Sequence, residues 1–294
     1  MIALQEHIMG TRLIFIISMT ISGTLAIFVR NIPLSSGEIA LFRGIIASAA
    51  IIVYQLVSSK RIRFSAIKND LVLLFLSGAV TGLAWILLFE AYSHTTVSLA
   101  TLSYYFAPVI VIIACPLLLK EKLTSGQVFC FIMSTVGLVL IIGVDGINTS
   151  TNNIRGISFG LGAAVCYAAV VILNKFIKNV TGIDRTLLQL FAAVIVLIPY
   201  VAATGGIHLG AAGSVGMINL LIVGIVHTGI TYCLYFTALI DLKGQEVAIL
   251  SYIDPLVAVI VSVTILSETI TFMQTVGGLM IIGFTLLNEL KMKA

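Results

Sequence analysis

Asp254 is the residue whose position most requires a chemical explanation. It lies about ten residues, roughly 15 Å at the helical rise, inside the apolar stretch 244–266. An ionisable side chain at such a depth in a membrane is costly and marks a functional candidate. Pro255 follows and cannot donate to the Ser251 carbonyl, so we expect a free carbonyl beside the carboxylate, with Ser251 and Asp254 on one helix face. The alternative is a structural hydrogen bond to a neighbouring helix.

Aromatic and hydroxyl side chains gather before a second proline. Pro108 removes the hydrogen bond to the Tyr104 carbonyl, beside the pair Tyr104 and Tyr105. A kinked helix with Thr101, Tyr105 and Pro108 on one face would line a cavity with polar tips and apolar walls. We expect Pro108 and Pro255 to act as hinges, although tyrosines at helical spacing also serve in packing.

A third set repeats every four residues. His227, Thr231 and Tyr235 share one face of the stretch 215–239, and His227 is central enough to titrate against Asp254. A lone histidine is also common as a packing residue, so both interpretations stay open.

Arg43 is a cation inside an apolar stretch. It lies about 10 Å from the start of that helix, where it would bind a carboxylate or pair with a membrane acid. Trp85 and Tyr232 are candidate cavity walls or packing residues. Glu90 lies nearer a helix end, and we expect it to reach the membrane interface.

The composition indicates that these residues are positioned by membrane-spanning helices. The chain of 294 residues is 60% hydrophobic and 10% charged, whereas soluble chains carry about 25% charged residues. We therefore predict an all-α integral membrane protein, because several stretches exceed the roughly 18 apolar residues of a spanning helix. The ten spans expected are 12–30, 36–57, 70–91, 96–119, 125–143, 156–178, 186–203, 215–239, 244–266 and 272–290.

No sign of an enzyme or a cofactor site is found. The histidines lack metal-ligand spacing, and neither a G-x-S-x-G elbow nor a phosphate-binding P-loop is present. Four cysteines lie in apolar stretches without a CxxC pair, which indicates packing: Cys115, Cys130, Cys166 and Cys233. We expect no catalytic residue, metal or cofactor. The first apolar stretch lacks a cleavage site, so we expect it to stay as a helix.

Positive charge is distributed unequally between the loops. With ten spans, one side of the membrane carries thirteen of the sixteen Lys and Arg residues. These are Arg12, Lys60, Arg61, Arg63, Lys68, Lys120, Lys122, Lys175, Lys178, Arg185, Lys243, Lys291 and Lys293. The positive-inside rule predicts that both termini are cytoplasmic. This placement, rather than nucleic-acid binding, accounts for the net charge of +4.

The chain repeats itself at half its length. At a constant shift of 147 positions, polar and helix-breaking residues match without a gap. The pairs are Tyr105 with Tyr252, Pro108 with Pro255, Glu121 with Glu268, Thr124 with Thr271 and Gln127 with Gln274. We predict two five-helix repeats, 1–150 and 151–294, which are inverted because an odd number of spans reverses the second copy. Such repeats are typical of alternating-access carriers with a central cavity.

The shared E-x-x-T-x-x-Q pattern has a structural explanation. A threonine followed three residues later by glutamine, before an apolar run, predicts a capping box at a helix start. Thr124 and Gln127 should therefore begin the fifth span, and Thr271 and Gln274 the tenth.

These residues support a resemblance to a family. Ten short-looped helices, with the repeated aromatic, proline and "EKLT" or "ETIT" patterns, resemble the EamA family of the drug/metabolite transporter superfamily. The resemblance covers nearly the whole chain and implies a cavity-containing exporter of the bacterial inner membrane, in some relatives driven by protons. One departure is that the aromatic-Gly pair of many relatives reads Ser22-Gly23 here, which weakens a substrate contact at Ser22.

We therefore expect a secondary transporter that exports an amino acid or related amine. The expected partners are a small-molecule substrate, protons as a candidate coupling ion, and the lipid bilayer, with a monomer as the working unit and no nucleic acid. The substrate-binding or coupling residues expected are Asp254, Ser251, Tyr252, His227, Tyr235, Tyr232, Trp85, Thr101, Tyr104, Tyr105 and Arg43. Alternatives are an uptake carrier for a quaternary amine, nucleoside-like compound or vitamin, and a membrane enzyme or non-transporting subunit.

Overall fold

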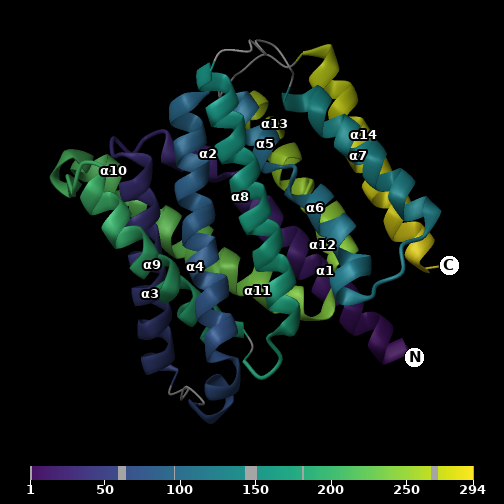
Figure 1. Ribbon diagram of the computed structural model, residues 1–294, viewed down its shortest axis with the longest axis horizontal. Helices are drawn as coiled ribbons and strands as arrows, with labels where there is room; N and C mark the ends of the chain where they lie inside the picture. Colours follow the sequence, from purple (N-terminus) through teal and green to yellow (C-terminus); the bar gives the residue numbers. More distant parts are fainter. Residues whose placement is uncertain are drawn as a thin grey trace.

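The structure is a computed structural model that describes residues 2–58, 64–95, 97–142, 151–180, 182–265 and 271–293. All regular structure in these residues is helical (Figure 1). The helices of the first half are α1 (Ile2–Gly23), α2 (Leu25–Val29), α3 (Ser36–Val57), α4 (Phe64–His94), α5 (Val97–Tyr104), α6 (Ala107–Ala114), η1 (Cys115–Leu119) and α7 (Ser125–Ile142). Those of the second half are α8 (Thr151–Phe176), α9 (Gly182–Ala203), η2 (Leu209–Ala212), α10 (Gly213–Ile222), η3 (Val223–Ile230), α11 (Thr231–Asp241), α12 (Gly244–Leu250), α13 (Ile253–Thr264) and α14 (Phe272–Lys293).

Six helical segments of the described residues are long and apolar enough to cross a membrane. They are Met9–Val29, Ser36–Val57, Ile67–His94, Asn153–Phe176, Gly182–Ala203 and Leu209–Asp241, and three shorter apolar segments are Ala107–Leu119, Ser125–Leu140 and Thr275–Asn288. The prediction of a helical membrane protein is thus confirmed. The count of ten spans and the inversion of the repeats stay predictions, because several expected spans are short or interrupted.

Two of the interruptions occur at the predicted proline sites. The chain leaves the helical path at Tyr105 and Phe106, between α5 and α6, and again at Ser251 and Tyr252, between α12 and α13. Pro108 lies in the first turn of α6. A proline is tolerated in a first turn because its missing N–H would have no helical partner there.

Two further irregularities border the same region. α1 and α2 are separated at Thr24, and the middle of the segment Leu209–Asp241 is the π-helix η3, which contains His227. π-Helical insertions are frequent at functional sites because the wider turn redirects side chains.

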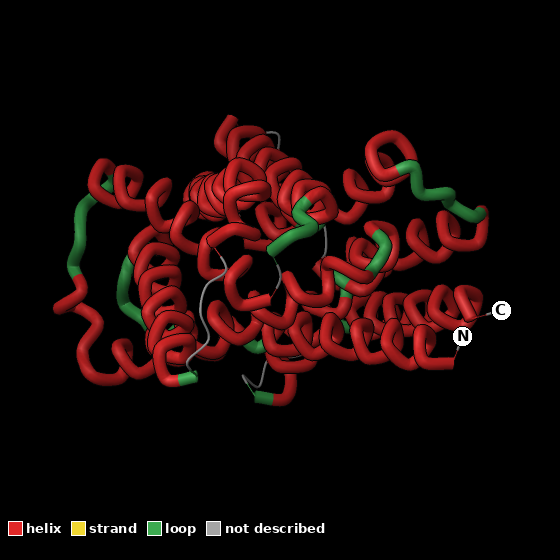
Figure 2. The backbone as a smooth tube through the Cα atoms, turned by 90° about the horizontal axis from the view of Figure 1, so that it is seen from below, coloured by secondary structure: helices red, strands yellow, loops and turns green. Residues whose placement is uncertain are grey.

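The helices form a bundle in which segments from both halves intermingle. α4 packs against α8 and α9, α1 packs against α11 and α13, and α7 lies along α14. Figures 1 and 2 both show α1 and α14 bringing the two chain ends close together. We call the end of the bundle where α1 begins and α14 stops the terminus end, and the opposite end the far end.

Small residues allow the closest helix contacts. A Cβ added to Gly78 on α4 would lie 2.2 Å from the Gln189 carbonyl oxygen of α9, so only glycine permits this approach. The capping box predicted for the first half is confirmed: the Thr124 hydroxyl accepts the Gln127 N–H at 3.3 Å, and Gln127 Oε1 accepts the Thr124 N–H at 2.9 Å. Glu268 and the side chain of Gln274 lie outside the described residues.

Candidate functional site

A cavity of about 570 Å³ lies in the part of the bundle away from the terminus end. Along α1, Met19 lines it but Phe15, one turn nearer the terminus end, is fully buried. Ala26 and Ser36 line the cavity and are exposed, so it reaches the surface at the far end. The predicted residues that line it are Arg43, Trp85, Thr101, Tyr104, Tyr105, Pro108, His227, Tyr232, Tyr235, Ser251 and Asp254. Side chains as far apart in the sequence as Arg43 and Asp254 thus share one site.

Asp254 lies in the first turn of α13, directly after the break. The first N–H groups of a helix lack partners and carry a partial positive charge, which favours a carboxylate there. The Tyr105 side chain is its polar neighbour in the cavity wall. The break thus explains how an acid is accommodated inside an apolar bundle.

One detail of the expected geometry is wrong. We expected Pro255 to leave the Ser251 carbonyl free, but this oxygen accepts the Asp254 N–H at 3.3 Å. The chain turns tightly enough between the two helices for a donor three residues later to reach the carbonyl. The polar groups offered to the cavity are therefore side chains.

Arg43 projects from α3 and lies above the indole of Trp85, with Cζ 4.0 Å from the ring centroid. Its Nε is buried and has no hydrogen-bond partner. Among the described residues no ion pair joins Arg43 or Asp254 to an opposite charge. The cavity thus contains one basic and one acidic side chain, and neither has an oppositely charged partner among the residues that the structure describes.

Aromatic rings form the walls between these two charges. Tyr104 packs edge-on against Tyr167 at 5.7 Å between ring centroids, and Trp85 lies 5.9 Å from Tyr232. The Tyr235 hydroxyl donates to the Tyr167 hydroxyl at 2.8 Å. These contacts orient the rings and hold the walls together.

Two lining tyrosines were missing from the predicted site. Tyr167 and Tyr92 both line the cavity, and the Tyr92 and Thr101 hydroxyl oxygens lie 3.4 Å apart. Tyr167 occupies in the second half the position of Ser22 in the first, and Ser22 also lines the cavity. The correspondence between Ser22 and Tyr167 in the two repeats could therefore have identified Tyr167 as a candidate from the sequence.

His227 faces the break between α1 and α2. Its Nε2 lies 3.0 Å from the Thr24 hydroxyl, and its ring lies 4.9 Å from that of Phe28. The sequence left open whether His227 titrates against Asp254 or serves in packing, and the hydrogen bond that the structure gives its Nε2 is to Thr24. His227 therefore links η3 to the interrupted first span at the cavity wall.

Tyr252 and Pro255 do not line the cavity. Tyr252 is fully buried, and its hydroxyl lies 2.8 Å from that of Thr135 on α7. Its repeat partner Tyr105 does line the cavity. Ala107 and Asp254, a pair at the same shift of 147, both line the cavity. A match between the two halves therefore does not by itself fix which way a side chain points.

The remaining polar candidates have structural partners. Glu90 accepts the Tyr200 hydroxyl at 2.8 Å. The cysteines are free thiols, and the described residues contain no group of three side chains that could hold a metal ion. Arg185, which is fully buried, donates to the carbonyls of Val180 and Ile177 beyond the end of α8.

Apolar spanning helices, interrupted spans and a charged, aromatic cavity together define a multi-pass membrane transporter, and the comparisons with known proteins agree. The pattern of the EamA-like transporter family matches residues 10–143 and again 154–289. The chain belongs to this family, whose members are transporters rather than enzymes.

Individual relatives support the same class. An uncharacterized transporter of Bacillus subtilis, YxxF, is 31% identical over 90% of this chain and 85% of its own length. Solute carrier family 35 member G1 of Mus musculus is 28% identical over 53% of this chain and 45% of its own length. A crystal structure with a TM-score of 0.81 and 17% identity covers 96% of this chain and 99% of the other, which shows a shared fold.

Proposed function

We propose that this protein is a secondary transporter that exports an amino acid or a related amine by alternating access. The observation that supports this best is that Arg43 and Asp254 line one cavity and that neither forms an ion pair within the described part of the chain. A buried unpaired charge is costly, so each side chain gains when an opposite charge of a ligand reaches it. A zwitterion brings both charges at once.

The proposed orientation follows from the side chains. The planar guanidinium of Arg43 suits a carboxylate, which it can bind with two parallel hydrogen bonds. Asp254, with the Tyr105 hydroxyl nearby, suits the ammonium group. The aromatic walls then contact the side chain of the substrate. We further propose that protons compete with the ammonium group for Asp254, so that a proton gradient drives export.

The membrane arrangement is part of the proposal. We propose ten spans in two inverted repeats, a bacterial inner-membrane location, cytoplasmic termini and a monomeric working unit. The equivalent breaks α5–α6 and α12–α13 support the repeats, and the excess of Lys and Arg supports the orientation. Single cysteines at Lys243 and Ile207 should react with an impermeant reagent from opposite sides, and labelling from one side would disprove this topology.

A quaternary amine is the second candidate substrate. Trp85 and the tyrosines supply the rings that hold such cations by cation–π contact. Counterflow in proteoliposomes separates the two, using an amino acid, its decarboxylated amine, its N-acetyl derivative and a quaternary amine. We expect fastest exchange for the free amino acid. If the amine and the amino acid exchange at equal rates, Arg43 does not bind a substrate carboxylate. If no compound shows counterflow, the proposed substrate classes are rejected.

A further inference from the structure

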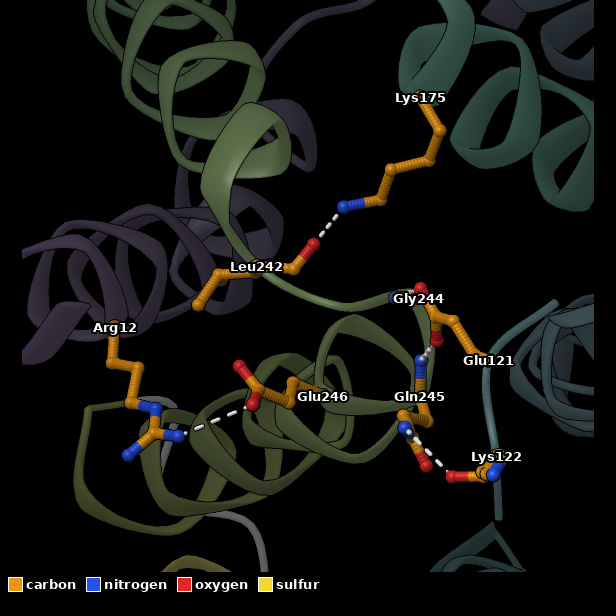
Figure 3. Close-up of polar contacts among 8 residues, drawn as sticks. All are labelled: Arg12, Glu121, Lys122, Lys175, Leu242, Gly244, Gln245 and Glu246. Atoms are coloured by element: carbon orange, nitrogen blue, oxygen red, sulfur yellow. Dashed lines mark hydrogen bonds and ion pairs between the residues drawn. The ribbon is translucent and has the colours of Figure 1, made fainter. Parts of the chain in front are cut away.

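The first turn of α12 is bound on two sides by segments of the first half. Residues 244–246 contact Arg12 on α1 and the segment 121–122 that follows η1 (Figure 3). We call this set the α12 clamp, consisting of Arg12, Glu121, Lys122, Gly244, Gln245 and Glu246. Its contacts join the two halves of the chain at the terminus end.

Glu121 supplies the central contact. Its Oε1 accepts the N–H of Gly244 at 3.0 Å, and its Oε2 accepts the N–H of Gln245 at 3.4 Å. The first N–H groups of a helix have no partner within the helix and favour negative charge. A carboxylate of the first half therefore caps a helix of the second half, which holds α12 in place.

Two flanking contacts support this cap. Arg12 Nη2 donates to Glu246 Oε1 at 3.2 Å, and both side chains are largely shielded from solvent. Gln245 Nε2 donates to the Lys122 carbonyl at 3.5 Å. Within the second half, Lys175 Nζ donates to the carbonyls of Leu239 and Leu242, which ties down the connection that leads into α12. Figure 3 shows the contacts of Arg12 with Glu246, of Gln245 with Lys122 and of Lys175 with Leu242.

The clamp and the cavity are separated by a closed layer of apolar side chains. Along α1, Phe15 lies between Arg12 of the clamp and Met19 of the cavity. Along α12, Val247 to Leu250 are at most 1% exposed and precede Ser251, which lines the cavity. The terminus end is therefore closed while the cavity reaches the surface at the far end.

We propose that the α12 clamp is the gate of the terminus end, with Glu121 as the positioning residue that keeps it shut. The inference rests on the proposed alternating access, since the cavity can open toward the terminus end only if α12 moves away from α1 and η1. Breaking the clamp shifts the population toward a state open at this end.

The test measures the distance across the clamp in the absence of substrate. Spin labels replace Lys120 and Lys243, which are both exposed and lie on the two sides of the clamp, in a cysteine-free background. Double electron–electron resonance then reports closed and open populations in lipid nanodiscs. We expect Glu121→Gln, which keeps the shape but removes the charge, to raise the open-to-closed ratio about tenfold, the effect of weakening one charged hydrogen-bonded contact.

Two controls separate gating from a general loss of structure. Glu90→Gln removes a carboxylate that bonds Tyr200 away from the clamp, and it should leave the distance distribution unchanged. A label pair at Lys120 and Phe129, both within the first half, should be unchanged in Glu121→Gln. An unchanged 120–243 distribution in Glu121→Gln overturns the proposal, and so does an equal change in both label pairs. Because no substrate is present, this outcome does not depend on which compound is carried.

Discussion

The guanidinium of Arg43 lies over the indole of Trp85 at the wall of the cavity, with the guanidinium carbon 4.0 Å from the ring centroid. The arginine comes from α3 and the tryptophan from α4. The indole stabilises the cation by a cation–π contact without neutralising it, so the guanidinium N–H groups keep their charge for a ligand. The pair thus holds a permanent positive charge ready for an anion.

Arg43→Lys should therefore weaken transport of substrates that carry a carboxylate. Lysine keeps the charge but loses the planar fork and the stacking on Trp85. We expect the KM for an amino acid in counterflow to rise about tenfold, the effect of losing one contact of 1–2 kcal/mol, with less change for the decarboxylated amine. Equal KM changes for both compounds would contradict a carboxylate site at Arg43.

Asp254→Asn should abolish accumulation driven by a pH gradient. Asparagine keeps the size and much of the hydrogen bonding of the side chain next to Tyr105 but cannot exchange a proton. Counterflow would persist at a reduced rate, because exchange needs no net proton movement. The measurement compares gradient-driven uptake by wild-type and mutant proteoliposomes. Unchanged accumulation would leave Asp254 as a structural residue and direct the search to Glu90 or His227.

Gly23→Ala should impair transport by a steric route. A Cβ at this position would lie 2.7 Å from the Asp254 carbonyl oxygen and 2.6 Å from the Val257 Cβ, so α1 and α13 would be forced apart. We expect the free energy of unfolding to fall by roughly 1–3 kcal/mol, the usual cost of overpacking. Counterflow should fall as well. Gly10→Ala is the matched control on the same helix, because no atom lies within 4 Å of its added Cβ. Similar behaviour of both variants would argue against a tight α1–α13 contact.

Pro108→Ala and Pro255→Ala should each lower transport more than expression. An alanine N–H can bond the carbonyl four residues earlier, which would extend helix across the breaks at 105–106 and 251–252. The breaks position Tyr105 and Asp254 at the cavity, so straightening them displaces both side chains. If the two variants carry substrate at the wild-type rate, the prolines are incidental to the breaks.

The sequence by itself determined the class of structure and predicted most of the residues that line the cavity. Composition alone required a membrane protein, since 10% charged residues cannot cover a soluble globule of 294 residues. Asp254 and Arg43 were recognisable because an ionisable residue inside an apolar stretch is costly and hence informative. The Thr124–Gln127 capping box was predictable because it depends only on residues three positions apart.

Only the tertiary structure decided which of these residues meet and which face they present. Tyr252 matched Tyr105 in the sequence, but its hydroxyl lies beside Thr135 and it does not line the cavity. His227 found Thr24 as a partner rather than Asp254, and Glu121 was found to cap α12, 123 positions later. Such contacts depend on how helices that are distant in the sequence pack against each other and on how each helix is rotated about its axis. Local residue spacing determines neither the packing nor the rotation.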